Sequence, residues 1–334
     1  MGWNSHRLQL HLVASVSRYG IEPRVVLRQS LFRVRAEEAA NPSLSVATVP
    51  KHSSFASASR GHTHSRGQAL ERAAVALRQR QFAEAEQFAA EVLKASRSDT
   101  AAVSILAQAL IAQDRQEEAI AHLEKAARRS GDASIETLLG AALGGAGRRA
   151  EAIEQLRQAT TRRPLFTPAF QELAGQLLKS GRVEEAIGVV ESALALAPES
   201  IDLQLDLARL QLYRNERGKA RAILLSAREA APGRPDILIE LARVQLLDGE
   251  YASAADTCRH ALGLRPDDAM TRATLASCLL ELGERDAGEA NLRVAMRGGP
   301  QLLGRASHAL AASSHGRFFF RPSALAKFLQ AKPD

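Results

Sequence analysis

Two arginines, Arg209 and Arg243, stand 34 residues apart in the nearly duplicated stretches LDLARLQL and IELARVQL. A guanidinium carries a planar fork of N–H donors that matches a carboxylate, so both side chains can hold acidic groups of an extended peptide. Asp206 and Glu240 stand three residues before these arginines, and that spacing makes ion pairs along one helix. Ligand contact and ion pairing are therefore both open for the two arginines.

The residue types that usually catalyse reactions or bind metals form no recognisable site. Cys258 takes an apolar helix position, so we expect a buried thiol, and a disulfide with Cys278 stays open. His62 and His64 form an isolated His-x-His pair, and the GGAG at 144–147 lacks the Lys-Ser/Thr of a phosphate-binding loop. We expect no catalytic residue, no metal and no cofactor, so the chain is not predicted to be an enzyme.

A ladder of prolines recurs at intervals of 34 residues, at Pro164, Pro198, Pro232, Pro266 and Pro300. A period of this size indicates a repeat architecture, in which one supersecondary unit is copied and stacked. Small residues recur twelve residues before each proline, at Ala152, Ala186, Ala220, Ala254 and Gly288. The same pattern extends upstream and gives seven units: 66–99, 100–132, 133–166, 167–200, 201–234, 235–268 and 269–302.

Each unit is predicted to be a pair of helices joined by a tight turn. Residues that tolerate the left-handed conformation recur where the first helix must stop, at Gly147, Gly181, Gly249, Gly283, Asp114 and Asn215. The proline ends the second helix, because proline cannot continue a helix and restricts the residue before it. Leucines and alanines three and four residues apart give both helices a buried stripe.

The pattern over residues 66–302 resembles the tetratricopeptide repeat (TPR) family. The best fragments are LLGAALGGAGRRAEAIEQLRQATTRRP, LAGQLLKSGRVEEAIGVVESALALAP and LARVQLLDGEYASAADTCRHALGLRP. The sequence departs from the family where an aromatic residue is usual early in the first helix, which only Phe170 supplies, and at Arg72, where leucine is usual. The resemblance implies an all-α fold, a right-handed α-solenoid of stacked antiparallel helix pairs forming a TPR-like superhelix.

The resemblance also implies a binding surface, because first-helix residues line the concave groove in this family. The residues expected there to contact a partner are Gln108, Gln171, Leu205, Arg209, Tyr213, Ile239, Arg243 and Leu246. The positions where some members clamp the C-terminal carboxylate of a chaperone hold Ser104, Gln108, Thr137 and Ala141. These residues lack the Lys/Asn arrangement of that clamp, so a chaperone-tail adaptor is disfavoured.

Residues 1–65 form a basic, Ser/Arg-rich extension that we expect to be mostly disordered. This extension contains eight basic and three acidic residues, so it contributes +5 of the net charge of +7. This composition fits an unstructured extension read from an upstream start, a transit or anchoring segment, or a contact with nucleic acid or an acidic partner. The first reading favours a bacterial cytoplasmic protein, and the second favours a mitochondrial or other organellar one. No apolar run is long enough to span a membrane.

Residues 303–334 follow the last repeat and carry the aromatic run Phe318, Phe319 and Phe320. A helix continuing the apolar period is expected first, and a short helix opening at Pro322 second. The segment is read either as a cap that covers the exposed end of the solenoid or as a docking segment for a partner.

The function predicted from these features is a non-enzymatic scaffold or adaptor that binds a partner protein or peptide in the groove. One alternative is an accessory or assembly factor of a bacterial envelope, secretion or polysaccharide system. Another is an organelle-targeted helical-repeat protein, and nucleic-acid binding is least favoured because the repeat region is nearly neutral. No small-molecule substrate is predicted.

Overall fold

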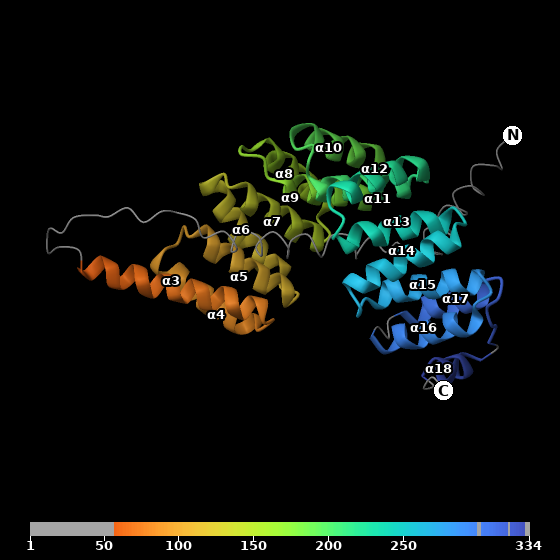
Figure 1. The fold of residues 1–334 in the computed structure, drawn as a ribbon. Coiled ribbons are helices and arrows are strands. Elements are labelled where there is room, and N and C mark those ends of the chain that lie inside the picture. Colours follow the sequence, from red (N-terminus) through yellow and green to blue (C-terminus); the bar gives the residue numbers. More distant parts are fainter. Residues whose placement is uncertain (1–56, 299–301, 320, 331–334) are drawn as a thin grey trace, which may run out of the picture. The chain divides into compact units, whose positions relative to one another are not determined.

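The computed structural model describes residues 57–298, 302–319 and 321–330 (Figure 1). These residues form 16 helices and no strand, which confirms the predicted all-α repeat fold. The chain divides after Leu196 into two compact units, called here the N-terminal unit and the C-terminal unit. Each unit is described by itself.

The N-terminal unit consists of consecutive helix pairs. Its helices are α3 (Ser57–Arg78), α4 (Phe82–Ala95), α5 (Thr100–Ala112), α6 (Gln116–Ser130), α7 (Ala133–Gly145), α8 (Arg149–Thr161), α9 (Thr167–Lys179) and α10 (Val183–Leu196). Each helix packs against the next, and α3, α5, α7 and α9 also pack successively against one another. The first helices of the repeats therefore form one row, as stacking of a repeated unit requires.

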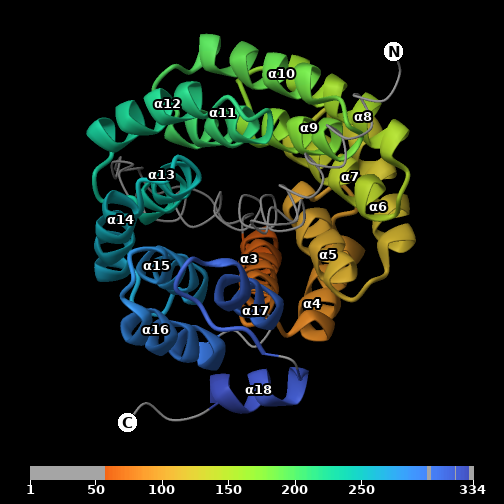
Figure 2. The same cartoon turned by 90° about the vertical axis from the view of Figure 1, so that its right-hand side faces the viewer.

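The C-terminal unit repeats this arrangement (Figure 2). Its helices are α11 (Ile201–Tyr213), α12 (Arg217–Ala230), α13 (Pro235–Leu247), α14 (Tyr251–Leu264), α15 (Ala269–Glu281), α16 (Arg285–Gly298), α17 (Leu303–Ala312) and α18 (Pro322–Gln330). The row of first helices runs through α11, α13 and α15, and α17 packs on α15 as a further member. The last helix, α18, packs on α16.

The turns inside the repeats confirm the predicted register. Positive φ angles occur at Asp114, Gly147, Gly181, Asn215, Gly249 and Gly283, which are all six predicted positions. The corresponding residue of the first repeat is Arg80, whose φ is 64°. Arginine pays a steric cost in this conformation, and its side chain gives no turn signal, so the sequence pattern did not point to it.

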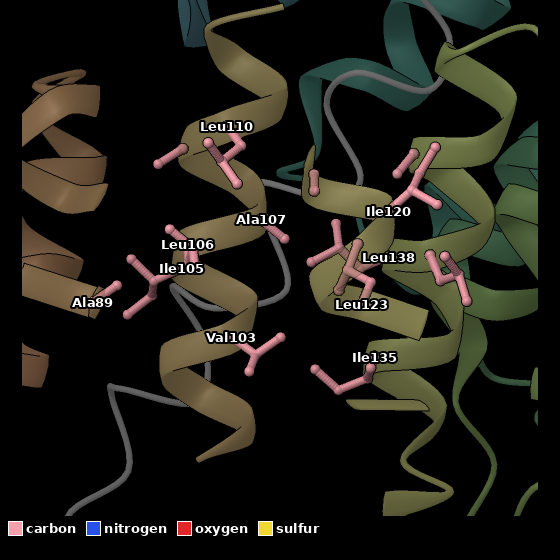
Figure 3. Packing of buried hydrophobic residues seen from close by; sticks show 14 of the residues in the cluster. Ala89, Val103, Ile105, Leu106, Ala107, Leu110, Ile120, Leu123, Ile135 and Leu138 are labelled. Atoms are coloured by element: carbon pink, nitrogen blue, oxygen red, sulfur yellow. The ribbon is translucent and has the colours of Figure 1, made fainter. Parts of the chain in front are cut away.

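The core is built from small residues that let helices approach and leucines that fill the space between them. Figure 3 shows Ile105 of α5 pointing toward Ala89 of α4, and Ala107 pointing the other way, toward Leu123 of α6; all four are buried. Two helices approach closely at Gly140, where an added Cβ would lie 2.4 Å from Cγ of Leu156. Helices α7 and α8 therefore meet where only glycine fits.

The beginning of the helical region differs from the predicted boundary. Helix α3 begins at Ser57, so its first nine residues lie in the extension of residues 1–65, which the sequence predicts to be mostly disordered. No proline lies between Pro50 and the first repeat, so no proline interrupts a helix that begins at Ser57. Residues 1–56 of the predicted 1–65 extension lie outside the described residues.

Candidate functional site

The predicted groove residues are divided between the two units. Gln108 lies on α5 and Gln171 on α9, both in the N-terminal unit. The other six lie on α11 and α13 of the C-terminal unit: Leu205, Arg209, Tyr213, Ile239, Arg243 and Leu246. Five of these six are partly exposed, but Leu205 is only 3% exposed and belongs to the packed core. It shares one helical stripe with Ala208 and Leu212, which are buried in the same cluster.

An alternating row of charges joins α11 to α13, and we call Asp206, Arg209, Glu240 and Arg243 the charge ladder. Arg209 Nη1 lies 3.3 Å from Asp206 Oδ1, and Arg243 Nη1 lies 3.0 Å from Glu240 Oε2. Both predicted ion pairs are therefore confirmed. A third pair crosses between the helices, because Arg209 Nε donates a 2.8 Å hydrogen bond to Glu240 Oε1.

Burial makes the charges of this ladder depend on one another. Glu240 is 4% exposed, and burial alone would raise the pKa of its carboxyl, but Arg243 and Arg209 outweigh burial and lower it. Burial likewise opposes the charge of Arg209, yet Glu240 and Asp206 raise the pKa of its guanidinium. Both groups are therefore held in their charged forms. The first role of Arg209 is structural, because it compensates the buried carboxylate of Glu240.

A third arginine, Arg305 of α17, lies close to the ladder without a carboxylate of its own. Its Nη1 lies 2.8 Å from Met270 Sδ and its Nη2 donates to Thr274 Oγ1 at 3.2 Å, both on α15. Among the described residues no acidic side chain forms an ion pair with it. Burial, and after it the charge of Arg243, lower the pKa of the Arg305 guanidinium to about 10.

Arg305 was not predicted from the sequence, because α17 follows Pro300, the last of the regularly spaced prolines. The 34-residue repeat period does extend to this position, because steps of 34 residues back from Arg305 lead to Thr271, Ile237 and Leu203. All three are buried. A cation at a position that earlier repeats bury is unusual, because a buried charge needs a compensating partner.

The C-terminal aromatic residues have different surroundings. The rings of Phe319 and Phe328 are 5.0 Å apart, and the Arg293 guanidinium lies 4.4 Å from the Phe328 ring centroid. Phe318 is 66% exposed, and Phe320 lies outside the described residues. Phe319 thus packs α18 onto the end of the unit, and Phe318 is the exposed aromatic side chain of the predicted docking run.

The two cysteines lie in the core of the C-terminal unit. Cys258 and Cys278 are buried free thiols, and the contact with Cys278, together with burial, raises the pKa of Cys258. A protonated buried thiol is a poor nucleophile. No group of three His, Cys, Asp or Glu side chains in that part is placed to hold a metal ion, and none of its helices can span a membrane. The side chains of His62 and His64 lie outside the described residues.

Models of one family match the repeats. Tetratricopeptide repeat models match residues 70–134, 137–201 and 177–244. A comparison with curated protein sequences found no match.

Solved structures with a similar fold come from distant proteins. A tetratricopeptide repeat protein from Parabacteroides merdae is 13% identical, with a TM-score of 0.57, over 74% of this chain and 99% of its own. Human IFIT1, as a dimer with m7Gppp-AAAA, is 15% identical with a TM-score of 0.54, over 70% of this chain and 60% of its own. The APC/C hetero-tetramer Cut9-Hcn1 gives 18% identity and a TM-score of 0.51 over 79% of this chain, which spans 55% of that chain. These identities show a shared fold.

Proposed function

Because the chain belongs to the tetratricopeptide repeat family, we propose that it is a non-enzymatic scaffold that binds a segment of a partner protein along α11 and α13. Repeats of this family support a role in protein interaction in general. The observation that carries the proposal is the mixture of apolar and cationic side chains along these two helices. Tyr213, Ile239 and Leu246 are partly exposed there beside Arg209 and Arg243.

The charge ladder supports the proposal because it orders this surface before a partner arrives. Arg209 is bonded to acidic groups of two helices, so its position is set by both. Side chains that are already ordered lose less conformational entropy on binding, which favours affinity for an extended segment. The apolar side chains around them supply the area that excludes water.

A protein partner is favoured over nucleic acid by the charge balance of this surface. The arginines Arg209 and Arg243 are matched by Asp206 and Glu240, whereas binding to a phosphate backbone requires a distinctly basic face. The RNA-like ligand of the human IFIT1 structure therefore does not transfer to these helices. Assembly into a larger complex, as in the Cut9-Hcn1 hetero-tetramer, agrees with a scaffold, and the accessory-factor alternative is one form of that role.

The test is affinity purification of the full chain from the organism of origin, followed by quantitative mass spectrometry. Ile239→Ala and Leu246→Ala remove apolar contacts from the proposed surface. Leu264→Ala is the matched control, because Leu264 lies on the second helix α14 and is 44% exposed. We expect a partner that is depleted by the first two changes and retained by the control. A partner retained by all three variants would place the binding surface elsewhere.

A further inference from the structure

Arg305 differs from the arginines of the charge ladder in its partners. Arg209 and Arg243 are paired with Asp206 and Glu240. Arg305 forms no ion pair with a described acidic side chain, and its hydrogen-bonding partners on α15, a thioether and a hydroxyl, are both neutral. A guanidinium that is partly removed from water and has only neutral partners is costly, so a counter-anion would stabilise it.

Arg243 has donors left for the same anion. Its Nη1 lies near Glu240 Oε2, but that oxygen accepts no aligned hydrogen bond. Glu240 instead takes its aligned hydrogen bond from Arg209 on its other oxygen. Arg243 therefore keeps N–H groups that are not committed to the ladder, and it lies close enough to Arg305 for the two charges to repel each other.

We propose that Arg243 and Arg305 together bind a carboxylate of an acidic segment of the partner protein, with Met270 and Thr274 beside it. This proposal rests on the scaffold function proposed above and names the chemistry that anchors the partner. A carboxylate has acceptor sites on both oxygens, so it can accept charge-assisted hydrogen bonds from two guanidinium groups, and such bonds are the strong ones. The anion would relieve the repulsion between the two arginines and compensate the charge that no described side chain compensates.

A carboxylate fits this surface better than a phosphate group. The charge without a carboxylate partner is that of Arg305, a single unit that one carboxylate neutralises. A phosphate monoester carries close to two negative charges at neutral pH, so it would leave a net negative charge beside Glu240. Arg305 is also partly exposed, so a group on an incoming peptide can reach it.

The experiment titrates acetylated hexaglutamate amide into the fluorescently labelled full chain at low ionic strength, with binding followed by thermophoresis. Hexaglutamine and inorganic phosphate are titrated in parallel. We expect hexaglutamate to bind and hexaglutamine not to bind. Arg305→Gln and Arg243→Gln are each expected to weaken hexaglutamate roughly tenfold or more, since hydrogen bonds to charged groups are the strong ones. Arg259→Gln is the charge-matched control, because Arg259 is exposed on α14 and paired with Asp256.

Retained cooperative melting of each variant shows that loss of binding is not loss of fold. Arg305→Gln should melt no lower than the wild type, since it removes a charge that lacks a compensating partner. Equal affinities of both variants and the wild type for hexaglutamate would overturn the site, and tighter binding of phosphate would overturn the carboxylate. A partner lost with Ile239→Ala but captured normally by Arg305→Gln would leave the scaffold standing and overturn the carboxylate site.

Discussion

Arg209 Nε donates a 2.8 Å hydrogen bond to Oε1 of Glu240, so that a cation of α11 compensates a buried carboxylate of α13. The two residues are 31 positions apart and belong to successive repeats. The bond thus ties one repeat to the next at the surface proposed for binding. It also makes Glu240 dependent on a helix other than its own.

Replacing Arg209 by methionine should destabilise the protein, because Glu240 would lose its aligned partner while staying buried. Removing one member of a buried pair typically costs about 3–5 kcal/mol. Because Arg209 is partly exposed and Arg243 still faces Glu240, the free energy of unfolding should fall by about 3 kcal/mol. Urea unfolding followed by circular dichroism measures it. Arg182→Met is the control, because Arg182 pairs with Glu185 on the exposed surface of α10 and should change the free energy of unfolding little. Equal midpoints for the two variants would contradict the structural role of the pair.

Acid should weaken the fold through Glu240. The folded protein lowers the pKa of this carboxyl, so below the ordinary glutamate pKa of about 4.3 the unfolded chain binds more protons than the folded one. The stability that Glu240 contributes is therefore complete above that pH and is lost as the pH falls through the folded-state pKa. Glu240→Gln should show a shallower decline of the free energy of unfolding from pH 5 to pH 3. Parallel declines in both proteins would contradict this assignment.

Arg80 should be replaceable by glycine with a gain in stability. It has a φ of 64°, in the region where side chains other than glycine are strained, and glycine takes the equivalent place in four later repeats. The left-handed conformation costs a residue with a side chain about 1 kcal/mol, so Arg80→Gly should raise the free energy of unfolding by up to about that amount. Arg72→Gly is the opposite control, since Arg72 is exposed in the interior of α3 and glycine disfavours a helix interior. A lower melting temperature for Arg80→Gly would show that its side chain stabilises the turn.

The parts of this molecule that follow from local spacing could be predicted from the sequence. The turns at Asp114 and Asn215 and the ion pair of Asp206 with Arg209 each depend on one helix or one turn. The bond from Arg209 to Glu240 depends on how two stacked repeats are rotated, which spacing along one helix does not set. Arg305 was missed because α17 lies beyond Pro300, the last of the regularly spaced prolines, although the 34-residue period still leads from buried positions of earlier repeats to it.

A last prediction concerns the packing of α7 against α8. An added Cβ at Gly140 would lie 2.4 Å from Leu156 Cγ, and Leu156 is fully buried, so the leucine has no room to move away. Gly140→Ala should therefore lower the free energy of unfolding by about 1–3 kcal/mol, the usual cost of overpacking a core. Other repeats carry alanine at this place, which confines the effect to the close approach of these two helices.

Gly188→Ala is the matched change, because Gly188 lies in the middle of α10 and no atom would meet its Cβ within 4 Å. Alanine is the better helix former, so this variant should gain about 0.5–1 kcal/mol. Thermal and urea unfolding of both variants measure the contrast, with the helix content checked by circular dichroism. If both changes stabilise the protein, α7 and α8 are farther apart than the structure places them. If both changes destabilise the protein, the face of α10 at Gly188 is in contact with another part of the protein.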